Sequence, residues 1–236
     1  MSRLLFIFDC FIFIGIGCKG KVEQPERTET ERPKEAEFVE RKLCIQCHEK
    51  QYKEWIGSHH DLAMDVATEE TVIGDFNNTT HTEHGVTSTF YKKDGKFFVR
   101  TDGRDGELHD YEITYVFGVD PLQQYMIEFP DGRIQLPDIG WDDHPKGQGG
   151  QRWVHLHSDE EITSGHMFHW TRPFLNWNYM CGECHTTNFQ KNYDLETKTF
   201  KTTWTMIDVG CQACHGPIST MAWVVTTRPG RCSERS

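Results

Sequence analysis

Helical and extended patterns of apolar residues alternate along the chain. Across residues 41–67 the apolar positions recur at helical spacing, with Leu43, Tyr52, Trp55 and Leu62 as candidates for an inward face. We therefore expect this segment to be helical. Between Trp153 and His185 aromatic residues dominate, and their spacing alone predicts no single type of element.

The middle of the chain has the pattern of strands. Residues 89–91 and 97–99 are rich in aromatic and β-branched side chains and flank Asp94-Gly95, which predicts a hairpin. Further strands and a turn are expected at Tyr111–Phe117, Tyr125–Phe129 and Asp131-Gly132. The pattern therefore predicts an α+β protein in which a small antiparallel sheet, within residues 86–137, is inserted between short helical segments.

The two ends of the chain differ from its middle. Residues 1–17 have a basic start and then an apolar stretch, which predicts a signal peptide. The stretch ends at Gly17-Cys18, as in bacterial lipoproteins, so Cys18 is a candidate for lipidation; ordinary secretion with cleavage elsewhere is the alternative. Residues 18–37 are charged and predict a disordered tether, and residues 224–236 form a polar tail. The folded domain is expected over residues 38–223, exported to the periplasm or cell envelope.

Composition narrows the choice of partners. The chain has 25 basic and 36 acidic residues, a formal net charge of −11. Such an acidic protein is a poor candidate for nucleic acid, whose phosphates are bound by Lys and Arg. Only 36 % of the residues are hydrophobic, below the roughly 45–50 % of ordinary soluble domains. A bound apolar group could fill part of the core.

Cysteine and histidine carry the most specific pattern. Cys-x-x-Cys-His occurs three times, at residues 44–48, 181–185 and 211–215. This is the attachment motif of c-type haem. Thiols three residues apart share one face of a helical turn and can bind the two vinyl groups of one porphyrin, while the next imidazole binds iron. We expect three covalent haems, attached through Cys44, Cys47, Cys181, Cys184, Cys211 and Cys214, with His48, His185 and His215 as proximal ligands.

Two other interpretations of the cysteines compete with haem. Cys181, Cys184, Cys211 and Cys214 could hold a structural zinc ion. Disulfides within each pair are also possible in an exported protein. Neither interpretation explains why a histidine follows all three pairs.

The second axial ligand of each iron decides between electron transfer and catalysis. Among the remaining histidines, His60 follows the first motif closely enough to serve a neighbouring haem, and His155 and His169 lie in the aromatic stretch before the second motif. Met64 is better explained as core packing than as a ligand. Met221 is a thioether candidate after the third motif.

Several segments together resemble a family, the exported multihaem c-type cytochromes, whose haem domain is often followed by tetratricopeptide repeats. The resemblance covers residues 38–223 and rests on the three motifs, on Trp-x-x-Ser-x-His at residues 55–60, and on the segments 117–118, 123–125, 149–153 and 178–181. It implies a haem-packed fold and electron-carrier chemistry, with His60 as a distal ligand and His155 and His169 as less secure matches. Similar proteins carry a histidine where this chain has Met221, and they continue further, so a C-terminal truncation is expected.

Two functions therefore remain. One is an electron carrier in the cell envelope that exchanges electrons with redox partner proteins. If these partners are basic, the acidic runs 142–143 and 159–161 would steer them toward the protein. The other is a haem-dependent oxidoreductase that acts on a small nitrogen or oxygen species at an open haem, with His144, His157 or Tyr125 as an acid or base. A lipid on Cys18 would add a membrane anchor to either.

Overall fold

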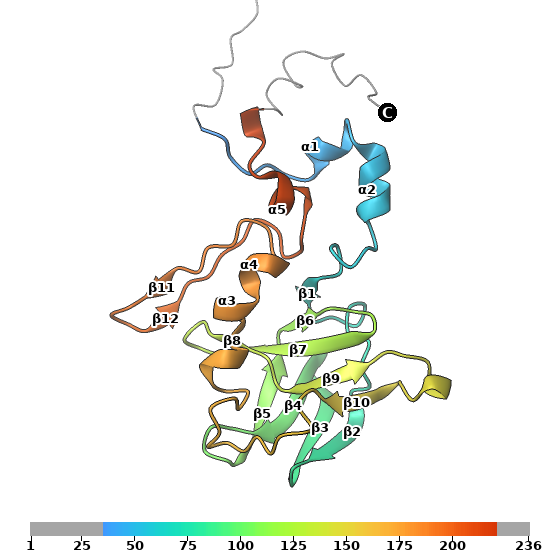
Figure 1. Ribbon diagram of the computed structural model, residues 1–236, viewed down its shortest axis with the longest axis vertical. Helices are drawn as coiled ribbons and strands as arrows, with labels where there is room; N and C mark the ends of the chain where they lie inside the picture. The colour runs from blue at the N-terminus through green and yellow to red at the C-terminus, as the bar shows by residue number, and fades with distance from the viewer. Residues whose placement is uncertain (1–34, 221–236) are drawn as a thin grey trace, which may run out of the picture. The chain divides into compact units, whose positions relative to one another are not determined.

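The computed structural model describes residues 35–220, in which the α-helices gather at one end of a predominantly antiparallel β structure (Figure 1). The predicted signal peptide, most of the tether, Cys18, Met221 and the polar tail lie outside these residues. The helices are α1 (Lys42–Ile45), α2 (Glu49–Trp55), α3 (Trp177–Met180), α4 (Gly182–His185) and α5 (Cys211–His215), with 3-10 helices η1 (Lys146–Gln148) and η2 (Pro173–Leu175). None of these helices is long and apolar enough to cross a membrane.

In residues 35–220 the strands form three antiparallel sheets. One has the order β1-β6-β7-β9-β10, with β8 also paired to β7; the others are β2-β3-β4-β5 and β11-β12. The strands are β1 (Met64–Val66), β2 (Asn77–Glu83), β3 (Val86–Lys93), β4 (Lys96–Asp102), β5 (Leu108–Ile113), β6 (Tyr115–Phe117), β7 (Leu122–Glu128), β8 (Ile134–Gln135), β9 (Ile139–Asp142), β10 (Arg152–His155), β11 (Tyr193–Asp194) and β12 (Thr199–Phe200).

The predicted hairpin is confirmed. Strands β3 and β4 pair around Asp94-Gly95, and both turn residues have positive φ, as a tight hairpin requires. The expected strand at residues 111–117 is divided into β5 and β6 at Thr114. The prediction of a small sheet was wrong in extent, because strands run from Met64 to His155 and form two sheets.

The helical prediction for residues 41–67 was wrong after Trp55. Gly57, with a φ of 73°, follows the end of α2, a position where glycine adopts the left-handed conformation at little cost. Met64 to Val66 then pair with Phe117 to Tyr115 as strand β1. Tertiary pairing with β6 therefore overrides the local helical spacing.

An aromatic cluster forms the core between the two larger sheets. Phe90 stacks on Trp153 with ring centroids 3.5 Å apart, and Phe76 meets Tyr125 and Trp153 edge to face. Each aromatic side chain buries more surface area than an aliphatic side chain does. These rings therefore compensate in part for the low fraction of hydrophobic residues, and no bound group is needed to fill this cluster.

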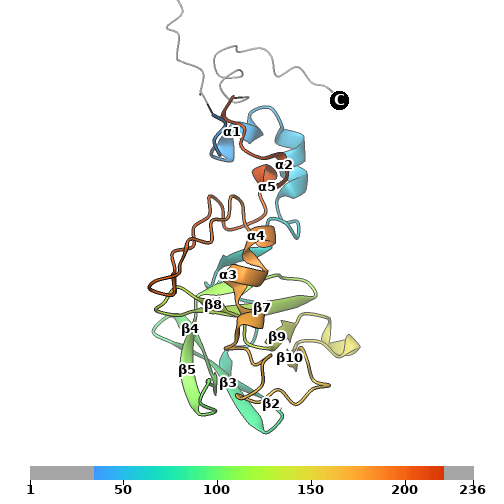
Figure 2. The same cartoon turned by 60° about the vertical axis from the view of Figure 1, so that its left-hand side comes forward.

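A second, smaller core lies under helix α3. It contains Met64, Met126, Ile134, Leu136 and Trp177. Met64 is only 1 % exposed, so its interpretation as core packing is confirmed. Helix α3 lies beside β8 and α4 follows it on the far side (Figure 2), which places Cys181 at the edge of this core.

Candidate functional site

All three Cys-x-x-Cys-His motifs form short helical turns. The amide of His48 donates to the carbonyl of Cys44 at 3.0 Å, and the amide of His185 donates to that of Cys181 at 3.2 Å. The third motif coincides with α5. The expected local geometry, with the first and second cysteine of a motif on one helical turn, is therefore present at each site.

The first and third motifs lie together. Arg41 precedes α1 and forms a 2.6 Å ion pair with Asp208, which precedes α5. The Gln212 side chain accepts from the amide of Val39 at 2.9 Å and donates back to its carbonyl at 2.6 Å. These contacts fix the two motif helices against one another, although most of the chain separates them in sequence.

The thiols of these two motifs are also neighbours. Cys211 lies close enough to Cys44 to affect the ionisation of its thiol. Burial, and next the neighbouring Cys211, raise the pKa of the Cys44 thiol, which keeps it protonated and lowers its reactivity as a nucleophile. Cys47 is disulfide-bonded in this structure, so a thioether at Cys47 requires that bond to be reduced first.

His60 lies next to the segment that leads into the third motif. Its carbonyl accepts from the amide of Val209 at 3.1 Å, and the indole of Trp55 donates to the Val209 carbonyl at 3.0 Å. The side chain of His60 is exposed and forms no hydrogen bond or ion pair within residues 35–220. Its role as a distal ligand of a haem on a neighbouring motif stays a prediction.

The second motif differs because it is partly buried. The ring of His185 lies 4.4 Å from that of Phe117, and its Nδ1 is buried with no hydrogen-bond partner in the described part of the chain. Burial lowers the pKa of His185. A neutral imidazole is the form that binds a metal, so the environment of His185 suits a proximal ligand.

One threonine links the second motif to the third. The hydroxyl of Thr187, two residues after His185, donates to the carbonyl of Asp208 at 2.9 Å and accepts from the amide of Gly210 at 2.9 Å. Both partners lie directly before α5. The three motifs are thus connected through the segment 208–210.

The surfaces beside the motifs are suited to a porphyrin. Ile56 is 51 % exposed, Leu62 39 % and Met180 61 %. Large apolar side chains so exposed near the motifs offer contacts to a flat apolar ring. Together with the unpartnered His185 Nδ1, these features fit covalent haem at the motifs.

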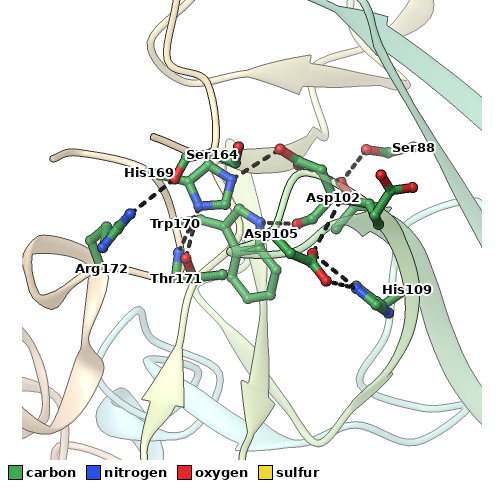
Figure 3. Close-up of polar contacts among 11 residues, drawn as sticks. Ser88, Asp102, Asp105, His109, Ser164, His169, Trp170, Thr171 and Arg172 are labelled. Atoms are coloured by element: carbon green, nitrogen blue, oxygen red, sulfur yellow. Dashed lines mark hydrogen bonds and ion pairs between the residues drawn. The ribbon is translucent and has the colours of Figure 1, made fainter. Parts of the chain in front are cut away.

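The structure does not bring His155 and His169 to the motifs. In residues 35–220 neither forms a hydrogen bond, ion pair or ring contact with a motif residue. His169 is 2 % exposed; its Nε2 bonds Asp102 at 3.0 Å and its Nδ1 bonds Thr171 at 2.8 Å (Figure 3). Iron ligation by His169 would require one of these bonds to break.

His155 belongs to the same polar region as His169. Its Nδ1 lies 3.6 Å from Asp138, and its ring meets that of His84 edge to face. Burial lowers the pKa of His155. The roles of His155 and His169 as axial ligands stay predictions.

The acid–base candidates of the enzymatic hypothesis are committed to structural contacts. The hydroxyl of Tyr125 is buried and accepts from the amide of Gly74 at 2.9 Å, and burial raises its pKa far above the ordinary value. His144 pairs with Asp142 and His157 with Asp138, both at 2.7 Å. Over residues 35–220, none of these groups forms a hydrogen bond, ion pair or ring contact with a motif residue.

The zinc interpretation has no geometric support in the described region. Within residues 35–220 no three His, Cys, Asp or Glu side chains are placed to hold a metal ion together. Cys184 and Cys214 are exposed. The four thiols therefore do not form a tetrahedral site.

Residues 43–100 and 143–216, more than half of the chain, match the family described as cytochrome c554 and c-prime. The chain belongs to this family. All three Cys-x-x-Cys-His motifs fall within the matched residues. The cytochrome c554 and c-prime family is one of c-type cytochromes, so this protein binds haem c covalently and takes part in electron transfer. No curated protein and no solved structure matches the chain.

Sequence reasoning missed the residues that hold the site together. Arg41, Asp208 and Thr187 carry no recognisable motif. The pairing of His169 with Asp102 likewise joins residues 67 positions apart. Only the tertiary structure reveals such partners.

Proposed function

We propose that this cytochrome carries electrons through three covalently attached haems, one on each motif, in the cell envelope. Haem supplies reversible one-electron exchange at its iron. The proposal is carried by one observation: the contacts of segment 208–210 with Arg41, His60 and Thr187 draw all three motifs to one place. Closely spaced attachment sites are what an electron relay requires.

The protein residues would have three separate tasks. Each cysteine pair fixes a porphyrin, and the following histidine binds iron from the proximal side. His60 supplies a distal imidazole near the third motif. Arg41, Asp208 and Thr187 fix the spacing between the attachment helices, although they touch no iron themselves.

Location and partners complete the proposal. We infer export directed by residues 1–17 and anchoring by lipid on Cys18, both outside the described residues. Residues 159–161 are exposed and would attract a basic redox protein, at a rate that falls as salt rises.

Intact mass spectrometry of the exported protein, with a pyridine haemochrome assay, tests the proposal. We expect three porphyrins per chain, and two in each variant that replaces both cysteines of one motif by serine. A Cys232→Ser variant, which replaces a cysteine outside the three motifs, is the matched control and should keep the wild-type mass increment for haem. A mature protein without bound porphyrin would overturn the proposal.

A second candidate is an oxidoreductase with one open haem. It is favoured by the state of His169, whose two ring nitrogens are both hydrogen-bonded, which leaves fewer imidazoles available as distal ligands. Resonance spectra distinguish the two functions. High-spin iron that binds an added ligand without displacing a protein ligand supports the second, and low-spin iron at every site rules it out.

A further inference from the structure

A cavity of about 330 Å³ is lined by residues of helix α3, the β11–β12 hairpin and the turn after β4. Its volume is at the lower end of the roughly 300–1,000 Å³ of small-molecule sites. Four of its lining residues are cationic, Arg104, Arg133, Arg172 and Lys198, and none is acidic. The chain as a whole has a net charge of −11, so this local cluster of positive charge is unusual. A cationic lining without acidic residues favours anionic ligands.

Among the residues that the structure describes, three of the four cations have no carboxylate partner. Arg133 pairs with Asp131 at 2.6 Å. In residues 35–220, Arg104, Arg172 and Lys198 form no ion pair. The Arg172 guanidinium donates to the Ser164 carbonyl at 3.2 Å, but its Nε is buried with no partner. That Nε is closed off from solvent, so the charged groups within reach of a ligand are those of the exposed Arg104 and Lys198.

The polar floor of the cavity is fixed in place. Asn176 donates to the side chain of Gln135 at 2.8 Å, and Gln135 donates in turn to the carbonyl of Arg172 at 3.0 Å. This chain of amides holds the backbone at Arg172. A site with a fixed frame loses little conformational entropy when it binds a ligand.

The backbone at Lys198 gives a further indication. Lys198 has a φ of 55°, a left-handed conformation in which glycine or asparagine is ordinarily found. The hairpin therefore carries a long cationic side chain at a position where local structure favours a smaller residue. This choice is explained if the ammonium group has a task in the cavity.

The cavity lies away from the thiol of the second motif. Tyr179 lines it and is 48 % exposed. Trp177 and Cys181, on either side of Tyr179, belong instead to the smaller core. Because residues two apart on a helix point in nearly opposite directions, the cavity opens on the face of α3 opposite to Cys181.

We propose that this cavity binds a free small organic polyanion, one that carries two or more carboxylate or phosphate groups. Arginine forks bind such groups in bidentate fashion. Tyr193 and Phe200 add an aromatic wall against which the carbon skeleton packs. The site is separate from the attachment motifs, so the proposal does not depend on the number of haems.

Equilibrium binding to the haem-loaded full chain, at constant ionic strength, tests the proposal with citrate and inorganic pyrophosphate as probes. We expect saturable binding of at least one probe. Lys198→Asn keeps a residue suited to positive φ, and Arg104→Gln changes an exposed side chain, so both variants should fold. Each should weaken binding by about tenfold.

The matched control neutralises the exposed Lys50 and Lys93 together, which removes two positive charges away from the cavity. This variant should bind the probes as the wild type does. Equal weakening in the control would reduce the effect to net charge and overturn the proposal. The proposal would also be overturned if neither probe showed saturable binding. It would be overturned as well if Arg104→Gln shifted the haem potential while the protein bound no probe, because that result would assign the cations to haem propionates.

Discussion

Arg41 and Asp208 lie 167 residues apart in the sequence and form a 2.6 Å ion pair. The pair joins the first attachment motif to the third. The guanidinium of Arg41 also lies over the ring of Trp55, 4.2 Å from its centroid. One side chain thus fixes α1, α2 and the segment before α5.

We predict that Arg41→Gln destabilises the folded protein by about 1–3 kcal/mol at neutral pH, because it leaves the mostly buried Asp208 carboxylate without its cation. Burial already raises the pKa of Asp208, against the effect of Arg41. The carboxyl therefore favours folding most when it is protonated, and its contribution declines as pH rises through the folded-state pKa.

Removal of Arg41 should raise that pKa further, so the destabilisation should shrink as the pH falls toward about 4. Urea unfolding at the two pH values measures this change. Lys53→Gln is the control, because Lys53 and Glu49 form an exposed pair that should contribute little at either pH. A loss in Arg41→Gln that is independent of pH would contradict the assignment.

The core below the second motif should respond to side-chain deletion. Met126 is 0 % exposed and packs in the cluster that includes Cys181. We expect Met126→Ala to lower the free energy of unfolding by about 2–5 kcal/mol, from lost burial and the cavity left behind. Met167→Ala removes the same atoms from a side chain that is 59 % exposed and should change stability by less than about 0.5 kcal/mol. Similar losses in the two variants would show that Met126 is not a core residue.

Alkaline stability should depend on Tyr115. Burial, and next the charge of Glu128, raise the pKa of Tyr115 to about 12. Because the folded-state pKa is raised, its contribution to stability is present below about pH 10 and is lost as the pH rises toward about 12. Tyr115→Phe should therefore lose less stability than the wild type across this range.

Thermal unfolding measured at pH values across that window tests this prediction. Tyr52→Phe is the matched variant, and its alkaline transition should follow that of the wild type. If Tyr115→Phe and the wild type decline in parallel, the transition belongs to other groups.

The parts of this protein that were predictable from sequence are those defined by neighbouring residues. The turn at Asp94-Gly95 and the helical turns of the Cys-x-x-Cys-His motifs are local, and both are present. The strand at Met64–Val66 was mistaken for helix because its partner Phe117 is remote. The ion pair of Arg41 and the engagement of His169 by Asp102 depend on long-range folding in the same way.

The turn at Asp131-Gly132 allows a final test, because it contacts a distant hairpin. Gly132 has a φ of 77°, and a β-carbon there would collide with the carbonyl oxygen of Phe200 on β12. Phe200 also donates its amide to the Asp131 carbonyl at 2.8 Å. Since both the backbone conformation and the collision with a backbone atom oppose a side chain, Gly132→Ala should destabilise by at least about 1–3 kcal/mol.

Gly147→Ala is the control for this substitution, because a β-carbon at Gly147 meets nothing within 4 Å and its φ is not positive. Its unfolding midpoint in urea should stay close to that of the wild type. If Gly132→Ala unfolds at the same urea concentration as Gly147→Ala, then the β11–β12 hairpin does not pack on this turn, and one wall of the proposed anion cavity would be absent as well.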